Sequence, residues 1–421
     1  METRRFFKLT QIVFFGLLFP LFFSSCEVFE EVLSPENNSG FIVNTTDDTS
    51  DINPGDDICE DENGNCSLRA AVQEANTRSQ VTYSIELQEG NYLLDSTLEL
   101  KNPFGVLIKG KGPERTVVNG NGAVRVFDIL KDEDVLSNIA INDLTISGGN
   151  PQYNFSLFRE TAGGGIRILT STSSAEPTFP ENPTPEIYPY VTLTNVIVED
   201  NISSYAGGGI ALLAGRLVLE SCIVRNNRVP AANLENSGGG YGGGIYNKMI
   251  LNVISSSVYQ NETSNTLSED AESIGEGGGI FNALDAQAFI SNSTISDNST
   301  EFGYGTGISS INGSRTRISN SSIIDNDDFG IKSFGADSLI FVNTVVSNSL
   351  PIGNNFYTLG GNFIDDLGSG SSRITLLGTP MSPDQLPGVG ETLDTMLSSF
   401  QRIINTWGYL PLFGSPLINV M

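Results

Sequence analysis

The chain has 421 residues, with 49 Asp and Glu against 22 Lys and Arg, and a formal net charge of −27. Such a charge repels nucleic acid and anionic headgroups, and it disfavours polyuronates unless a local basic patch or a bridging cation intervenes. There is no His, which excludes Ser-His and Cys-His nucleophiles and histidine metal ligands.

The first 26 residues have the order of an export signal. A basic start precedes an apolar run over 12–23, which is too short for a typical membrane span. The junction Phe-Phe-Ser-Ser-Cys resembles the bacterial lipobox, which implies cleavage after residue 25 and acylation of Cys26. We therefore expect an exported protein, lipid-anchored in the outer membrane or at the cell surface. An ordinary signal with an incidental Cys is the alternative.

Residues 27–65 contain twelve acidic residues and no Lys or Arg. This composition predicts a solvated linker, except that residues 41–43 can add a strand. The acidic side chains Asp56, Asp57 and Asp61 are candidate Ca²⁺ ligands, because Ca²⁺ prefers carboxylate oxygens. A linker without a metal is the competing interpretation.

The cysteines after residue 26 differ in their surroundings. Cys59 and Cys66 lie close together in a polar loop of an exported chain, where a disulfide is the expected state. Cys222 lies in an apolar run and is expected to be a small buried side chain. Directly after Cys66, residues 67–76 predict a short helix, with Ser67 as its N-cap and one apolar face. Such a helix is suited to cover the open end of a solenoid.

Two motifs alternate from about residue 80 onward. One is a glycine run followed by Ile, at 163–166, 207–210, 242–245 and 277–280, with weaker copies at 305–308 and 330–331. The other is a short β-branched strand ending in Asn, at Asn201, Asn227, Asn261, Asn298, Asn326 and Asn348. The steps between these asparagines are 26, 34, 37, 28 and 22 residues.

These alternating motifs predict a parallel β-helix. Each step fits one coil plus a loop of variable length, and no helical segments lie between the strands. Coils stacked about 4.8 Å apart turn each repeated position into a column. Buried Asn in such a column can form a ladder of side-chain hydrogen bonds, and Gly permits the turn that bends the coil.

Insertions between coils cluster before the glycine runs, at 228–241, 262–276 and 299–304. They leave one corner of the coil, whereas a Pro-rich excursion at 174–189 leaves another. Stacked loops form a continuous edge at which solenoids commonly bind ligands. Four aromatic residues near these loops can stack on sugar rings or serve packing. They are Tyr205, Tyr241, Phe302 and Tyr304.

Residues 66–76, Cys-Ser-Leu-Arg-Ala-Ala-Val-Gln-Glu-Ala-Asn, resemble the CSLREA domain that opens many exported β-helix proteins. Segments 108–113, 117–120, 125–129, 144–149 and 414–419 follow the order of that family. The glycine-run units are similar to the repeats of polymorphic outer membrane proteins. The resemblance covers about residues 41–420 and implies a pectin-lyase-like fold, which does not determine an activity.

We therefore predict an all-β fold, a single right-handed parallel β-helix with a short N-terminal capping helix. The expected parts are a signal peptide at 1–25, an acidic flexible tether at 26–40, a CSLREA-type cap at 41–80, the β-helix at 81–374 and a C-terminal capping segment at 375–421.

Enzymes of the pectin-lyase-like fold carry acids on a strand face, with Ca²⁺ and an Arg or Lys base, or with paired Asp. The position before the ladder asparagine holds Asp200, Asp297 and Asp325, and the last two fall on adjacent coils about 5 Å apart. Arg225 is the nearest candidate base or substrate clamp. The same column also holds Asn, Gln and Ser, which favours solvated turns over catalysis.

One basic concentration stands out in the acidic chain. It consists of Lys101, Lys109, Lys111, Arg115 and Arg125. These side chains can contact an anionic glycan or form the solvated side of the first coils.

The combined observations predict a non-catalytic binding or adhesion scaffold whose ligand is a glycan or another cell-surface molecule. The scaffold needs no cofactor and reaches the membrane through its lipid anchor, and we expect a monomer that does not bind nucleic acid. A polysaccharide lyase or glycoside hydrolase is the alternative, and a lyase would use Ca²⁺.

Overall fold

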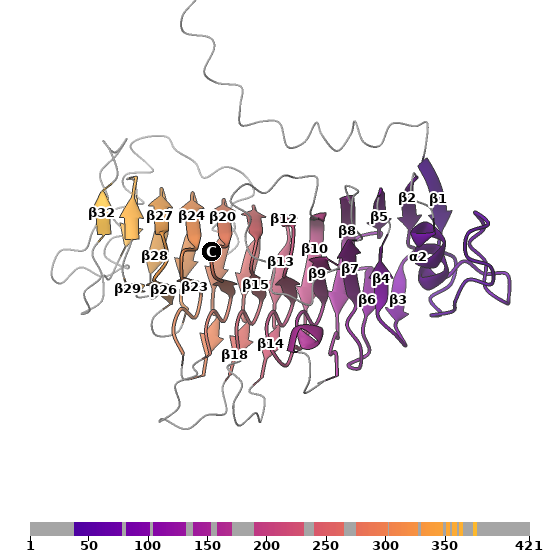
Figure 1. The fold of residues 1–421 in the computed structure, drawn as a ribbon, viewed down its shortest axis with the longest axis horizontal. Coiled ribbons are helices and arrows are strands. Elements are labelled where there is room, and N and C mark those ends of the chain that lie inside the picture. Colours follow the sequence, from indigo (N-terminus) through magenta and orange to yellow (C-terminus); the bar gives the residue numbers. More distant parts are fainter. Residues whose placement is uncertain are drawn as a thin grey trace, which may run out of the picture.

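The strands stack into one elongated parallel β-helix, which confirms the predicted right-handed all-β solenoid (Figure 1). The computed structural model describes residues 38–77, 81–101, 104–131, 138–152, 158–170, 189–230, 240–264, 275–301, 303–326, 330–347, 351–353, 356–359, 362–364 and 374–376. The N-terminal cap lies at one end of the stack, and the last described strands lie at the other.

Sheet A is the largest sheet and consists of two parallel rows of strands. The long-strand row contains β1 (Asn38–Ile42), β2 (Thr82–Glu86), β5 (Gly105–Lys109), β8 (Asn138–Ser147), β10 (Tyr190–Glu199), β12 (Arg216–Glu220), β16 (Ile250–Ile254), β20 (Gln287–Ser291), β24 (Arg315–Ser319), β27 (Ser338–Val342), β30 (Phe356–Thr358) and β32 (Ile374–Leu376). The short-strand row contains β3 (Gly90–Leu93), β6 (Thr116–Asn119), the second halves of β8 and β10, β13 (Ile223–Arg225), β17 (Ser257–Tyr259), β21 (Thr294–Ser296), β25 (Ser322–Ile324), β28 (Val345–Ser347) and β31 (Phe363–Ile364).

Sheet B is built from the strands that follow the glycine runs. It contains β4 (Leu98–Leu100), β7 (Phe127–Lys131), β9 (Ile166–Thr170), β11 (Ile210–Leu212), β15 (Ile245–Asn247), β19 (Ile280–Asn282), β23 (Ile308–Ile311), β26 (Ile331–Phe334) and β29 (Pro351–Gly353). Sheet C is minor and contains β14 (Arg228–Val229), β18 (Glu262–Thr263) and β22 (Ser299–Thr300). A 3-10 turn, η1 (Phe158–Thr161), precedes the first glycine run.

Glycine runs are required because successive coils approach closely at this corner. The first glycine of a run has a left-handed backbone, as at Gly207 with φ of 63°. The second has no room for a side chain, since a Cβ at Gly208 would lie 2.4 Å from the carbonyl oxygen of Gly243. The Ile that follows points inward and is fully buried in each of the coils, as at Ile210. The motif therefore combines a turn with close stacking of the backbone.

The asparagine ladder runs down the corner after the short-strand row. Asn227 accepts hydrogen bonds at Oδ1 from the backbone N–H and the Nδ2 of Asn201, at 3.1 and 3.0 Å. Its own Nδ2 donates to the Val198 carbonyl at 2.9 Å and to Asn261 Oδ1 at 3.0 Å. The same pattern continues through Asn298. Five of the six predicted asparagines, from Asn201 to Asn326, lie in this ladder, and Asn348 lies outside the described residues.

A second ladder crosses the turn between the two rows of sheet A. The backbone N–H of Cys222 donates to Ser256 Oγ at 2.9 Å, and Ser256 and Ser293 donate to the next serine in the same way. Cys222 is buried, and burial raises the pKa of its thiol to about 12. It is therefore a small packing residue in the serine column.

The N-terminal cap contains the helix α2 (Leu68–Asn76), with Ser67 Oγ accepting from the Ala70 N–H at 2.9 Å as its N-cap. Its buried face packs against the first coils beside β2 and β4. Strand β1 pairs with β2, so the solenoid already begins at Asn38, at the junction of the predicted tether and cap.

The expectation of a solvated linker is wrong for residues 38–40 and 44–65. The strand allowed at residues 41–43 is present, since residues 41 and 42 belong to β1. The loop that follows β1 is held by carboxylates that accept backbone N–H groups. Buried Glu74 accepts from Gly55 and Asp57, each at 2.5 Å, and Asp51 accepts from Asn53 and Glu60. Composition suggested disorder because it counts charges and not these bonds.

Asn227→Ala should destabilise the solenoid by about 2–4 kcal/mol, because it removes the acceptor of the buried backbone N–H and Nδ2 of Asn201 and the amide that donates to the Val198 carbonyl. Urea unfolding followed by circular dichroism measures the change. Asn292→Gly is the matched control, because Asn292 lies on an exposed turn with φ of 51° that glycine tolerates. Equal stability of the two variants would contradict a structural role for the ladder.

Candidate functional site

The predicted catalytic aspartates occupy one column of left-handed turn residues, just before the asparagine ladder. Asp200, Asp297 and Asp325 have φ of 55°, 51° and 53°. Strands β21 and β25 are paired, so Asp297 and Asp325 lie on adjacent coils as expected. Asp200 does not join them, because the coils of Asn226 and Gln260 intervene and set it about 14 Å from Asp297, at three strand spacings.

Arg225 belongs to the other end of this column. Its guanidinium bonds Glu199 Oε2 at 2.6–2.7 Å and donates to the Tyr259 hydroxyl at 3.0 Å. Burial raises the pKa of Asp200, and neighbouring Glu199 adds to this effect. Arg225 therefore lies with Asp200 and away from the Asp297 coil. The structure does not assemble the four candidates into one catalytic group.

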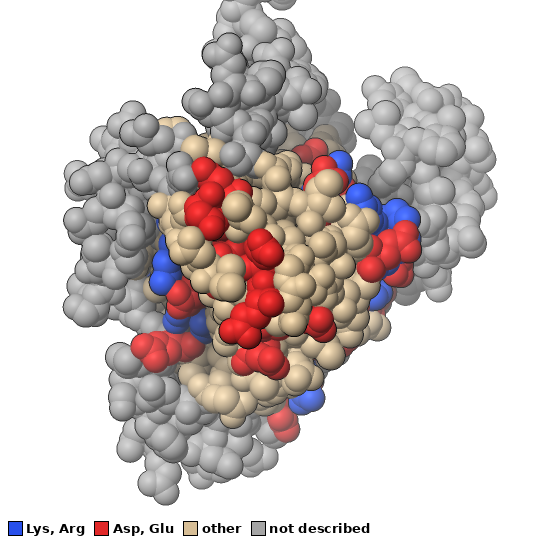
Figure 2. Space-filling model, turned by 90° about the vertical axis from the view of Figure 1, so that its right-hand side faces the viewer, with Lys and Arg blue, Asp and Glu red and all other residues tan. Residues whose placement is uncertain are grey.

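The candidate Ca²⁺ ligands Asp56 and Asp61 accept hydrogen bonds from groups of the cap loop itself. Asp61 accepts from the Thr49 hydroxyl at 2.7 Å and from the N–H groups of Asn63 and Asn65. Asp56 accepts from the N–H of Ile58. No group of three or more Asp, Glu or Cys suited to a metal occurs among the described residues. Figure 2 shows an acidic band across the N-terminal end of the stack. Cys59 and Cys66 form a disulfide in the cap.

The basic concentration seen in the sequence is largely neutralised. Three of its members form ion pairs, namely Lys101 with Glu99, Lys111 with Glu86 and Arg115 with Glu89. Arg125 is only 5% exposed and belongs to a different surface. Two other candidates, the lipidation residue Cys26 and the aromatic Phe302, lie outside the described part of the chain.

An aromatic face on the outer side of sheet B is the most distinctive surface among the described residues. We define it as Tyr205, Tyr241, Tyr246, Phe281 and Tyr304. The second residue of each sheet B strand from β7 to β26 points outward and forms one column. In chain order this column reads Asp128, Arg167, Ala211, Tyr246, Phe281, Ser309 and Lys332. The residue before each glycine run forms a second column, which reads Ala206, Tyr241, Glu276 and Tyr304.

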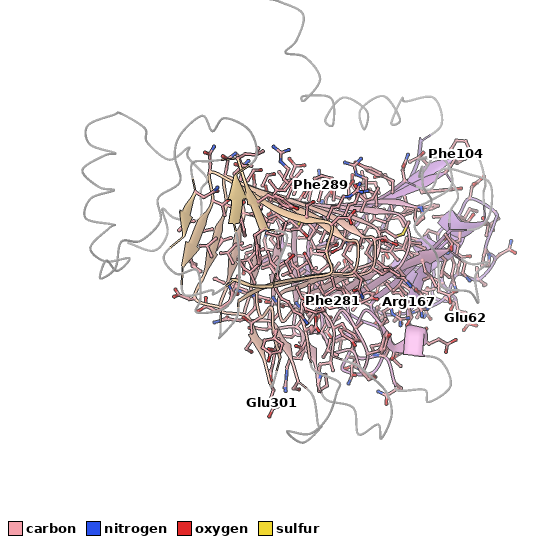
Figure 3. All side chains as sticks on the ribbon, turned by 60° about the vertical axis from the view of Figure 1, so that its left-hand side comes forward. Glu62, Phe104, Arg167, Phe281, Phe289 and Glu301 are labelled. Carbon is pink, nitrogen blue, oxygen red and sulfur yellow. A yellow bond between two sulfur atoms is a disulfide. The ribbon has the colours of Figure 1, made fainter. Side chains whose placement is uncertain are left out.

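Ring contacts join the two columns into one cluster. Phe281 stacks on Tyr246 with centroids 5.6 Å apart and packs against Tyr241 at 4.7 Å. Tyr205 meets Tyr241 edge-on at 6.4 Å. Phe281 is 3% exposed, whereas the tyrosines remain half-buried. Figure 3 shows Phe281 and Arg167 at a similar height in the view, below Phe289.

An arginine-aspartate network borders the aromatic face toward the N-terminal end. Asp128 is bound by Arg167 at 2.9 and 2.5 Å and by Arg125 at 3.4 Å. Arg125 also donates to the carbonyls of Gly163 and Ala162, at 2.9 and 3.0 Å. Burial lowers the pKa of Arg125 to about 10, although Asp128 counteracts this effect. Each charged side chain of this network therefore already has a partner within it.

A lysine-glutamate pair borders the opposite end. Lys332 Nζ lies 2.5 Å from Glu276 Oε1, and each side chain is 16% exposed. Ser309 donates to the other Glu276 oxygen at 2.8 Å, and Lys332 lies 5.6 Å from the centre of the Tyr304 ring. Burial raises the pKa of the nearby Tyr241 phenol, and Glu276 adds to this shift. The phenol therefore stays neutral across the physiological pH range.

Sequence reasoning located the corner but did not identify two of the five residues of the aromatic face. Tyr205, Tyr241 and Tyr304 were singled out, whereas Tyr246 and Phe281 were not. The missing signal was the position directly after each glycine-run Ile, which alternation along a strand places on the outside. Reading that position in every coil would have found the column.

The comparisons with known proteins reach no family. No protein-family model and no curated protein matches the sequence. A pectate lyase structure is 11% identical, with a TM-score of 0.41, and the match covers 83% of this chain and 79% of that one. A mannuronic acid specific polysaccharide family 6 lyase from human gut microbiota is 11% identical with a TM-score of 0.34, over 72% and 64% of the chains.

The A-module of a mannuronan C-5 epimerase from Azotobacter vinelandii is 16% identical, with a TM-score of 0.31, over 82% of this chain and 96% of that one. The activities in these names belong to those proteins. The described part of the chain contains no helix with the length and apolar character needed to cross a membrane.

The cap should loosen in acid. Hydrogen bonds from Thr49, Asn65 and Asn63 lower the pKa of Asp61 below its ordinary 3.8. The stabilisation by Asp61 is therefore present above pH 3.8 and is lost as the pH falls through the lowered pKa of the folded state. Amide protection factors for residues 63–65, measured by exchange at several pH values, should drop over this window.

Asp61→Asn should lower these protection factors already at neutral pH and flatten their acid dependence. Asp47→Asn is the control, because exposed Asp47 bonds only within its own turn. The same acid dependence in wild type and Asp61→Asn would argue against the assignment.

Proposed function

We propose that the protein is an exported, lipid-anchored scaffold that binds a glycan without chemical conversion, through the aromatic face of sheet B. The observation that carries the proposal is the ring cluster in which the half-buried Tyr241 and Tyr246 pack against Phe281 and Tyr205 packs against Tyr241, with charged side chains at both ends. Aromatic rings offer flat apolar area to the C–H faces of sugars, and phenol hydroxyls can bond sugar hydroxyls.

The position of this cluster supports a role in binding. Both columns lie at the corner where the insertions before the glycine runs leave the stack. The rings are carried by paired strands of a rigid sheet, which holds their geometry before a ligand arrives and lowers the cost of binding.

An enzyme is supported less well by the described residues. A hydrolase needs two carboxyl groups at a defined separation together with groups that orient the sugar. Asp297 and Asp325 lie on adjacent coils, but Asp200 lies three coils from Asp297. Arg225 is bound to Glu199 and Tyr259. Their turn column also lies apart from the aromatic face, since it borders the short-strand row.

Tyr246→Ala should weaken glycan binding about 3- to 10-fold, because it removes one ring and the stacking partner of Phe281. A glycan array identifies ligands of the purified protein, and calorimetry with the best one measures the change. Tyr190→Ala is the matched control, because Tyr190 is a half-buried tyrosine on sheet A whose ring lies under Arg216. Equal losses in both variants, or none in Tyr246→Ala, would contradict binding at the aromatic face.

Cys26→Ser should abolish lipid attachment and release the protein into the soluble fraction, because the thiol is the acylation site implied by the lipobox-like junction. Labelling of cells with a palmitate analogue and fractionation measure both effects. Cys222→Ser should leave labelling intact, since its thiol is buried. Undiminished labelling of Cys26→Ser would refute the anchor.

A further inference from the structure

We propose that the ligand of the aromatic face is a neutral glycan, one whose sugar rings carry hydroxyl groups and no carboxylate, sulfate or phosphate. This inference rests on the proposed function, because it names the class of ligand for the same surface. It is carried by the ion pairs that close both ends of the face.

The charged side chains that border the rings already bind one another. Both oxygens of Asp128 are held by Arg167, and Arg125 approaches the same carboxylate at 3.4 Å. Glu276 has one oxygen on Lys332 and the other on Ser309. To form an ion pair here, an anionic sugar would have to displace the Asp128 or Glu276 carboxylate from its cation.

Burial makes that displacement unfavourable. Arg125 and Asp128 are 5% and 4% exposed, and Lys332 and Glu276 are each 16% exposed. Breaking such an ion pair leaves a carboxylate without its counterion where water reaches poorly. The free-energy penalty exceeds the free energy gained from one new contact with the sugar.

The local charge balance gives no long-range attraction for an anion. The cations are Arg125, Arg167 and Lys332, and the carboxylates are Asp128, Glu276 and Glu160, the last of which acts on Arg125, so the balance at the face is 3 − 3 = 0. The whole chain carries −27. An acidic polysaccharide approaching this face is therefore repelled by the rest of the molecule before it meets any unpaired cation.

The remaining groups suit an uncharged sugar. The raised pKa of Tyr241 keeps its phenol neutral, so its hydroxyl can donate to and accept from sugar hydroxyls. A glycan running along the stack would thus meet aromatic side chains of successive coils, about 4.8 Å apart.

Calorimetry with the full-length protein tests the class of ligand. The probes are cello-, xylo- and galacto-oligosaccharides, with oligogalacturonate and oligomannuronate of equal length, at about 50 and about 500 mM NaCl. We expect a neutral probe to bind with less than about a twofold change between the two salt concentrations. Preferred, salt-sensitive binding of a uronate would overturn the neutral class and leave the proposed function standing. Binding of no glycan would overturn both.

A charge-releasing variant gives an independent test. Glu276→Gln keeps the shape of the side chain but frees Lys332, so uronate binding at low salt should rise about 5- to 10-fold over wild type and fall again at high salt. Lys332→Gln is the matched control and should show no gain, because it removes the cation. Circular dichroism verifies folding of both variants. A folded Glu276→Gln without gain, or an equal gain in Lys332→Gln, would overturn the role assigned to the ion pair.

Discussion

Hydrogen bonds between the buried asparagines of successive coils hold one corner of the solenoid in register, and the outer surfaces depend on that register. Each amide satisfies a backbone N–H and a backbone carbonyl that face away from water. A slip of one residue in any coil would reverse which side chains point outward. The rings of Tyr246 and Phe281 meet because the ladder brings equivalent positions of two coils to neighbouring strands, although 35 residues of variable sequence separate them.

The fold could be predicted because its determinants repeat. Glycine runs and strand-ending asparagines recur with the same neighbours, and each has a physical reason to stay the same, close backbone stacking in one case and buried amides in the other. The aromatic face could be predicted only in part, because its positions repeat while their identities do not. The column after the glycine-run Ile changes from Arg167 to Ala211 and then to Tyr246, so no motif reveals it. The separation of Asp200 from Asp297 follows from the sequence itself, since Asn226 and Gln260 stand between them in the same column.

Composition alone was misleading where charges have local partners. The acidic loop of the cap orders itself because Glu74 and Asp61 accept backbone N–H groups, which a count of charges cannot reveal. The few cations likewise have partners: Arg69 forms an ion pair with Asp48 in the cap, and Arg167 forms one with Asp128 on sheet B. A net charge of −27 thus describes how the molecule acts at long range, whereas each surface has a local balance of its own.

The glycine runs also make the coils interchangeable units. Gly242 and Gly277 begin the runs before Ile245 and Ile280 with φ of 63° and 66°, so loss or duplication of one whole coil joins equivalent ends of the asparagine ladder. Such an event in the gene would alter the length of the outer surface and the neighbours of Glu276. Unequal recombination between the repeats is therefore a route by which this solenoid can change its outer surface in single steps.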